Sequence, residues 1–167
     1  MTELPADLLS LAKEVLTVAK SRNKRIVTAE SCTGGLLTGC LTAMPGSSQV
    51  VDCGFITYSN ESKTQLLGVP SDAIKDLGAV SDVVASAMAE GALAQANANI
   101  AVSITGIAGP DGGTKEKPVG LVYMALAQTD EDAQVKRYVF AGTRTDIRRA
   151  AVGAALELVL TCLKDAE

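Results

Sequence analysis

Three short polar segments contain the residues most able to do chemistry in this chain of 167 residues. They are Glu30-Ser-Cys-Thr-Gly-Gly35, Tyr58-Ser-Asn-Glu-Ser-Lys63 and Thr105-Gly-Ile-Ala-Gly-Pro-Asp-Gly-Gly113. Each segment contains hydroxyl groups, and the second ends in a lysine. Because activated hydroxyls are nucleophiles and neutral amines are bases, the segments indicate chemistry at a small electrophilic centre.

The chain contains no histidine. This excludes Ser-His-Asp and Cys-His catalysis as well as zinc sites that depend on histidine. None of the four cysteines has the Cys-x-x-Cys spacing, so free thiols are expected at Cys32, Cys40, Cys53 and Cys162. We therefore expect neither a metal ion nor a cofactor.

Lys63 is the best candidate for a general base. A lysine whose pKa is lowered by burial or by a neighbouring cation can take the proton of a serine hydroxyl. The alternative is an ordinary solvated lysine on a helix. Tyr58 is a candidate to orient a substrate ring or relay a proton, and an interfacial tyrosine with no such role is the alternative.

Two of the segments have sequence features that suit an anionic ligand. The residues from Ser31 to Gly35 open an expected helix, whose free N–H groups and dipole favour an anion. A simple N-cap with a tight turn is the alternative. The Gly-rich segment that begins at Thr105 lacks the Gly-Lys-Ser/Thr of a phosphate-binding P-loop, because Thr114-Lys115-Glu116 follows it. A purely structural loop is the alternative there.

Apolar spacing and Gly or Pro breaks predict the elements that position these segments. Helices are expected over residues 8–20, 36–43, 72–77 and 81–97. A short helix is expected to follow Tyr58-Ser-Asn-Glu-Ser-Lys63 and to end at Gly68, and the last helix is expected to begin at Thr143 or Asp146 and to end at residue 164. Strands are expected over residues 25–30, 50–58, 100–105, 119–127 and 134–140. The second strand is mostly apolar, which predicts a central position, and the last two strands are expected to form an antiparallel pair.

The β-α-β-α-β order up to Thr105 requires parallel strands with right-handed crossovers. The expected fold is α/β, a three-layer α/β/α sandwich with a mixed, mostly parallel five-stranded sheet. Ligands bind beyond the carboxyl ends of such strands, where the three segments meet and the fifth strand adds Gly142-Thr-Arg144 and Arg148. Ser48 would begin its strand at the opposite end, so it reaches this site only through an irregular strand start or from a partner subunit. The alternative is that Ser47-Ser48 is a plain turn.

Size and charge limit the remaining possibilities. The length suits one domain over residues 1–167. A net charge of −4 argues against nucleic acid as a partner, and no apolar run is long enough to span a membrane. The first ten residues lack the basic and apolar stretches of a signal peptide, so a cytoplasmic location is expected.

Six motifs together resemble one known family, the C-terminal domain of the competence/damage-inducible protein CinA. They are Ala29-Glu-Ser-Cys-Thr-Gly-Gly-Leu36, Pro45-Gly-Ser-Ser48, Thr57-Tyr-Ser-Asn-Glu-Ser-Lys63, Gly78-Ala-Val-Ser81, Thr105-Gly-Ile-Ala-Gly-Pro110 and Lys117-Pro-Val-Gly120. Their order and spacing match across nearly the whole chain.

The resemblance implies a five-stranded mixed sheet in an α/β/α sandwich and an amidohydrolase that converts nicotinamide mononucleotide to nicotinic acid mononucleotide and ammonia. It also implies that five residues belong to the site: Ser31, Ser48, Tyr58, Lys63 and Thr105. A homo-oligomer with a small nucleotide substrate is expected. Longer relatives carry an additional N-terminal domain, for which this chain has no room.

In the expected mechanism, a serine attacks the carboxamide while Lys63 accepts its proton, with Ser31 favoured over Ser48 on geometry. N–H groups near Ser31 or Gly106, together with the Thr105 hydroxyl, are expected to bind the oxyanion. Arg144 or Arg148 is expected to bind the phosphate, and Glu30 or Asp111 to pair with the pyridinium. Thr33 and Gly34 are expected to make further contacts with the substrate.

Two competing hypotheses remain open at this point. Cys32 is an alternative nucleophile, because a helix N-terminus can lower the pKa of a thiol. The other alternative is a non-catalytic nucleotide-binding or partner-binding module with the same pocket.

Overall fold

A computed structural model describes residues 4–165. The helices are α1 (Ala6–Ser21), α2 (Leu36–Thr42), α3 (Asn60–Leu67), α4 (Ser71–Leu77), α5 (Asp82–Gln95) and α6 (Arg144–Asp165), with a short 3₁₀ turn at Ser47–Gln49. The strands are β1 (Ile26–Glu30), β2 (Val51–Ile56), β3 (Ile100–Gly106), β4 (Leu121–Gln128) and β5 (Gln134–Val139). No helix among the described residues is both long and apolar enough to cross a membrane.

The five strands form one mixed sheet in the order β2-β1-β3-β4-β5. β1 pairs in parallel with both β2 and β3, whereas β4 is antiparallel to β3 and to β5. Four strands therefore run in one direction and only β4 runs against them. This confirms the expected mixed, mostly parallel sheet, and also the expected antiparallel pair.

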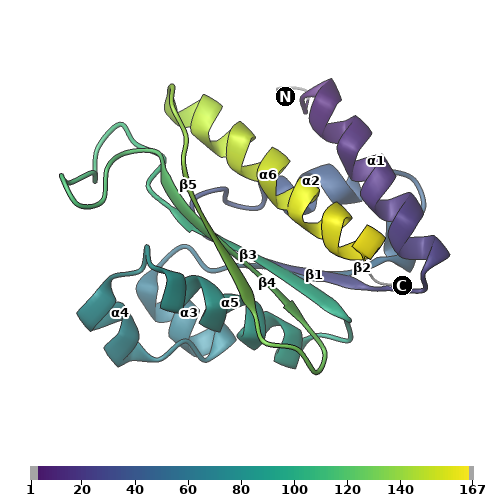
Figure 1. Ribbon diagram of the computed structural model, residues 1–167, viewed down its shortest axis with the longest axis horizontal. Helices are drawn as coiled ribbons and strands as arrows, with labels where there is room; N and C mark the ends of the chain where they lie inside the picture. The colour runs from purple at the N-terminus through teal and green to yellow at the C-terminus, as the bar shows by residue number, and fades with distance from the viewer. Residues whose placement is uncertain (1–3, 166–167) are drawn as a thin grey trace.

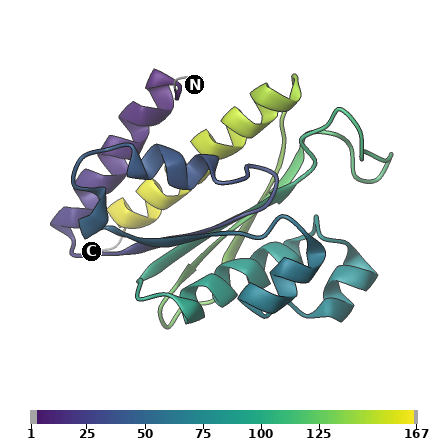
Figure 2. The same cartoon turned by 180° about the vertical axis from the view of Figure 1, so that it is seen from behind.

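Two helical layers cover the sheet, so the three-layer prediction is confirmed. Helices α1, α2 and α6 lie on one face, and α3, α4 and α5 lie on the other (Figures 1 and 2). Ser81 caps α5 as expected, since its hydroxyl accepts a hydrogen bond from the Val84 N–H. Thr143 and Asp146 cap α6 together, because the Thr143 N–H and hydroxyl donate to the Asp146 carboxylate and the Asp146 N–H donates back to the Thr143 hydroxyl.

The predicted central position of the second strand is wrong, because β2 is an edge strand. Val51 is its only buried side chain, and Ile56 is 53% exposed. Apolar composition predicted burial on both faces, but an edge strand can have the same composition when one of its faces is covered. The fully buried strand is β1, in which all five residues are inaccessible.

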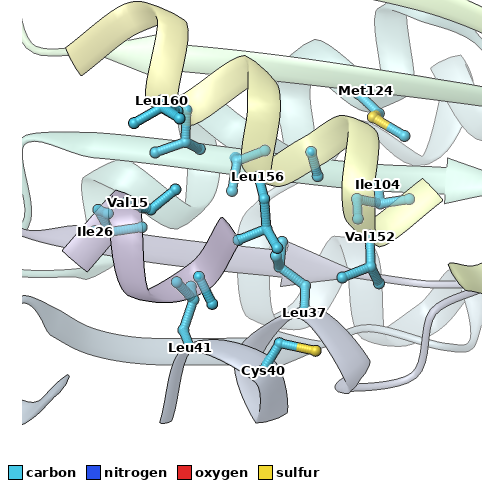
Figure 3. Packing of buried hydrophobic residues seen from close by; sticks show 14 of the residues in the cluster. Val15, Ile26, Leu37, Cys40, Leu41, Ile104, Met124, Val152, Leu156 and Leu160 are labelled. Atoms are coloured by element: carbon cyan, nitrogen blue, oxygen red, sulfur yellow. The ribbon is translucent and has the colours of Figure 1, made fainter. Parts of the chain in front are cut away.

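A large apolar core fills the layer beneath α1, α2 and α6. Val152 and Leu156 of α6 lie near Leu37 of α2, and Leu41 of α2 lies near Val15 of α1 (Figure 3). The side chains on the sheet side include Ile26, Ile104 and Met124. Because most of these side chains are aliphatic, burial of apolar area is the main force that holds this layer together.

The core of the opposite layer is smaller and contains many alanines. Gly91 of α5 lies against the backbone of α3: a Cβ atom at this position would be 1.9 Å from the Leu67 carbonyl oxygen. Only glycine permits this approach, because the obstructing atom belongs to the backbone and cannot rotate away. The contact fixes α3, the helix that carries Lys63, against the rest of the domain.

We predict that Gly91→Ala lowers the free energy of unfolding by about 1–3 kcal/mol, the usual cost of overpacking. Gly39→Ala in α2 is the matched control, since its Cβ would meet nothing within 4 Å. That substitution should stabilise the protein by about 0.5–1 kcal/mol through lower chain entropy. Urea unfolding of both variants measures the difference, and equal stability of the two would contradict the tight α3–α5 contact.

Candidate active site

Four chain segments meet beyond the carboxyl ends of β1, β2, β3 and β5, as the strand directions predict. Hydrogen bonds join them in pairs. Lys63 reaches Ser31, Arg144 reaches both Tyr58 and the Gly109 carbonyl, and Arg148 reaches the Thr33 carbonyl. The predicted meeting of these segments at one end of the sheet is therefore confirmed.

In this cluster, Ser31 and Lys63 form a side-chain pair that joins a hydroxyl to an amine. Lys63 Nζ lies 3.1 Å from Ser31 Oγ and donates a hydrogen bond of 2.8 Å to the Thr57 carbonyl. Ser31 directly follows β1, and its N–H donates to the Ile104 carbonyl of β3. The hydroxyl therefore projects from a turn whose backbone is held by the sheet.

Lys63 is almost completely buried, with a side chain 1% exposed. Burial lowers the pKa of its amine below the usual 10.5, because desolvation penalises the charged form. A larger share of the amine is therefore neutral near pH 7 than in a solvated lysine, as a general base requires.

The geometry argues against the alternative nucleophile, Cys32. This side chain is 6% exposed, and burial raises the pKa of its thiol to about 11. The thiol therefore stays protonated near neutral pH, whereas nucleophilic attack needs the thiolate. Ser31 is the better candidate because it has a base at hydrogen-bond distance.

Glu30 has a structural role that its sequence position did not reveal. Its carboxylate is fully buried and accepts hydrogen bonds from the N–H groups of Gly35, Leu37 and Thr38 and from the Thr38 hydroxyl. These donors lie at the start of α2. The anion expected at this helix N-terminus is thus the protein's own carboxylate, and the helix start is not free for a substrate phosphate.

A cavity of about 280 Å³ opens beside Ser31. Ser31, Cys32, Tyr58 and Arg144 line it together with the loop residues Gly106, Ile107, Ala108, Gly109, Asp111 and Gly112. A larger hollow of about 450 Å³ lies between α3 and α4, but neither Ser31 nor the Lys63 amine borders it. We place the candidate site in the smaller cavity because it is lined by Ser31, whose hydroxyl contacts the Lys63 amine.

Two arginines from the start of α6 reach this end of the sheet in different ways. Arg144 is exposed, and its guanidinium donates to the Tyr58 hydroxyl at 3.0 Å and to the Gly109 carbonyl at 2.9 Å. Arg148 is half-buried behind the Ser31 turn, where it donates to the Thr33 carbonyl at 2.8 Å. Arg144 lines the cavity and Arg148 supports its wall, so Arg144 is the better placed of the two to meet a ligand.

Four other predicted site residues contribute backbone structure. Thr33 is fully buried, and Gly34 beside it has a φ of +58° that favours glycine. The Thr105 hydroxyl donates at 2.7 Å to the Ala79 carbonyl, so its one hydrogen already has an acceptor. Gly106 borders the cavity, but a Cβ there would lie 2.7 Å from a Val122 methyl group.

Ser48 does not join the cluster within one chain. It is exposed in the 3₁₀ turn that precedes β2, at the end of the sheet opposite Ser31. The irregular strand start considered from the sequence does exist, but it does not bring Ser48 to the cavity. A role for this serine therefore requires a second copy of the chain.

Some contacts were not anticipated from the sequence. The Thr57 carbonyl orients Lys63, and the Gly109 carbonyl orients Arg144. Backbone acceptors of this kind have no signature in residue type, although both residues lie within motifs that follow strands. Among residues 4–165, no group of three or more His, Cys, Asp or Glu side chains is arranged to hold a metal ion.

Comparison with known proteins decides the family. The family model of the CinA C-terminal domain matches residues 8–163. The chain belongs to the CinA C-terminal domain family. One member, from Escherichia coli K12, is named nicotinamide-nucleotide amidohydrolase PncC; it is 45% identical over 152 residues, which cover 91% of this chain and 92% of that protein.

Other members of the CinA family show that the same domain occurs in two settings. A putative competence-damage inducible protein from Caldicellulosiruptor bescii is 46% identical, and the match covers 89% of this chain but only 36% of that protein. The solved structure of competence/damage inducible protein CihA from Agrobacterium tumefaciens has a TM-score of 0.94 and 44% identity, covering 99% of this chain and all of that one. The fold described above is the fold of this family.

The lowered pKa of Lys63 predicts a dependence of stability on pH. A folded state with a depressed lysine pKa binds fewer protons than the unfolded chain, so stability rises with pH in the window between the folded pKa and 10.5. Relative to Lys63→Met, wild type should therefore gain stability as the pH rises through that window toward 10.5. Chemical unfolding of both proteins across that range measures this gain. A difference that stays constant with pH would contradict a lowered pKa.

Proposed function

We propose that this protein hydrolyses the carboxamide of nicotinamide mononucleotide, giving nicotinic acid mononucleotide and ammonia, with Ser31 as nucleophile and Lys63 as general base. The observation that carries the proposal is the 3.1 Å contact between a buried lysine amine and a serine hydroxyl that lines a cavity. The chain's amidohydrolase class rests on its family and on its likeness, over nine-tenths of both chains, to nicotinamide-nucleotide amidohydrolase PncC.

In the first half of the reaction, Ser31 Oγ attacks the carboxamide carbon while neutral Lys63 Nζ accepts the hydroxyl proton. The amine keeps its second hydrogen bond to the Thr57 carbonyl, which aims its lone pair at Ser31. The C–N bond then breaks, and Lys63 returns the proton to the leaving nitrogen, which departs as ammonia. An ester between Ser31 and the nicotinoyl group remains.

In the second half, a water molecule attacks this ester. Lys63 Nζ takes a proton from the water and gives it back to Ser31 Oγ as the acid product leaves. The same amine thus acts as base and acid in turn, which removes the need for histidine.

Both tetrahedral intermediates carry an oxyanion that needs hydrogen-bond donors. We assign this role to the N–H of Cys32, because the residue after a nucleophilic serine on a strand-to-helix turn is placed to donate there. The residue lines the same cavity as Ser31. The Thr105 hydroxyl is not assigned this role, since it donates to the Ala79 carbonyl.

The two ends of the substrate differ in charge, and so do the walls of the cavity. Arg144 provides a guanidinium that suits a phosphate, and Asp111 provides a carboxylate that suits the positive pyridinium ring. Glu30 is left out of this assignment because its carboxylate is buried and fully bonded. Tyr58, which is 60% exposed, can stack on the ring or hold Arg144.

The first activity prediction concerns the base. Lys63→Met should keep the fold and lower the rate of ammonia release from nicotinamide mononucleotide by about 10²–10⁴-fold, the usual contribution of general-base catalysis. Lys63→Arg should not restore the rate, because a guanidinium does not lose its proton in a protein. Turnover by Lys63→Met within a few-fold of wild type would contradict the role of the amine.

A companion experiment separates the two serines. Ser31→Ala should abolish labelling by a serine-directed acylating reagent, as read by intact-protein mass spectrometry. Ser48→Ala should keep both labelling and turnover if one chain forms the whole site. If Ser48→Ala loses labelling and Ser31→Ala keeps it, the nucleophile is Ser48.

The second activity prediction concerns phosphate recognition. Nicotinamide riboside lacks the phosphate, so wild type should turn it over with a kcat/KM about ten- to a hundredfold lower, matching the loss of a charge-assisted hydrogen bond. Arg144→Met should lower kcat/KM for the mononucleotide by a similar factor and leave that for the riboside nearly unchanged. Equal losses for both substrates would show that Arg144 does not recognise phosphate.

A further inference from the structure

Two motifs that the mechanism does not use are bonded to each other. The Lys117 ammonium, from Lys117-Pro-Val-Gly120, donates to the carbonyl of Leu77, which directly precedes Gly78-Ala-Val-Ser81, and to the carbonyl of Val80 within that motif. The Val80 contact is 2.8 Å. A Cβ at Gly78 would lie 3.0 Å from the Lys117 nitrogen, so glycine allows the amine its close approach. A cation at the carboxyl end of α4 also meets the negative end of the helix dipole.

Lys117 belongs to the loop that forms one wall of the cavity. The Lys117 N–H donates to the Thr114 hydroxyl and the Thr114 N–H donates to the Lys117 carbonyl, so this end of the loop is closed on itself. Val119 packs inside the loop: a Cβ at Gly109 would lie 2.6 Å from its side chain, and one at Gly113 would lie 2.7 Å from its N–H nitrogen. These contacts tie the two ends of the loop together.

The same loop holds Arg144, because the Gly109 carbonyl accepts a hydrogen bond from its guanidinium at 2.9 Å. A continuous series of contacts thus leads from the turn before α5, through Lys117 and the loop, to the arginine at the mouth of the cavity (Figure 1 shows the loop projecting beyond the sheet near the start of α6). The Ser31–Lys63 pair lies outside this series, since it is held by Thr57 and Ile104.

We propose that Lys117 is a positioning residue for substrate binding: it fixes the loop of residues 107–120 so that the Gly109 carbonyl presents Arg144 to the phosphate of the substrate. The proposal rests on the proposed function of Arg144. It predicts that loss of the Lys117 amine weakens nucleotide binding without impairing the Ser31–Lys63 chemistry. A lysine that only stabilised the fold would instead change stability, with no selective effect on binding.

The test compares Lys117→Met with Lys115→Met, a matched control on the same exposed loop segment. Lys117→Met should raise KM for nicotinamide mononucleotide about tenfold and change kcat by less than about threefold, whereas Lys115→Met should change neither. In an Arg144→Met background, Lys117→Met should change KM by less than about twofold, because the residue through which it acts is already absent. If the increase in KM caused by Lys117→Met is as large in the Arg144→Met background as in wild type, the two residues act independently and the proposal is overturned.

Two readouts separate this proposal from the proposed function. Labelling of Ser31 by a small acylating reagent should proceed at the same rate in Lys117→Met as in wild type, and a matching loss of labelling would overturn a selective role in binding. Hydrogen exchange over residues 107–113 and the first turn of α6 should speed up in Lys117→Met and not in Lys115→Met. If wild type does not hydrolyse the mononucleotide, the proposed function fails, yet exchange still decides whether Lys117 holds the loop: unchanged exchange would overturn it.

Discussion

The structure depends on keeping one lysine amine out of water. Lys63 Nζ is held between the Ser31 hydroxyl and the Thr57 carbonyl, at the point where β1 and β2 end. Desolvation there works against the charged form and lowers the pKa of the amine. The domain accepts an unfavourable buried amine at the position where a neutral base is useful, a combination that is typical of active sites.

The surrounding elements serve this constraint. Glycine at position 91 lets α5 press on the end of α3, which fixes the helix that carries the lysine. The Glu30 carboxylate accepts hydrogen bonds from the N–H groups at the start of α2, so the turn that carries Ser31 keeps its shape. Arg148 supports the same turn from behind through the Thr33 carbonyl. Glu30 and Arg148, which were expected to contact the substrate, thus contribute by holding the backbone of the site.

Much of this arrangement could be predicted from sequence, and the reasons for the failures are physical. Strand periodicity and the rule that ligands lie beyond carboxyl strand ends placed Ser31, Lys63 and Arg144 together. The same reasoning put β2 in the centre of the sheet, because residue composition does not show whether a strand has a neighbouring strand on both sides. It also treated Glu30 as a ligand group, since residue type does not reveal that N–H groups five to eight positions later enclose its carboxylate. Contacts made by backbone carbonyls, such as that of Gly109, cannot be read from side-chain identity at all.

The most direct test of the central claim is the ionisation of Lys63 itself. Nitrogen-detected NMR of a protein labelled at lysine Nζ, assigned with Lys63→Met, gives the pKa of this amine in the folded state. The account predicts a pKa below 10.5 that coincides with the ionisation governing kcat/KM for nicotinamide mononucleotide. A Lys63 pKa at or above 10.5, or one unrelated to the pH dependence of the rate, would contradict a neutral lysine as the base.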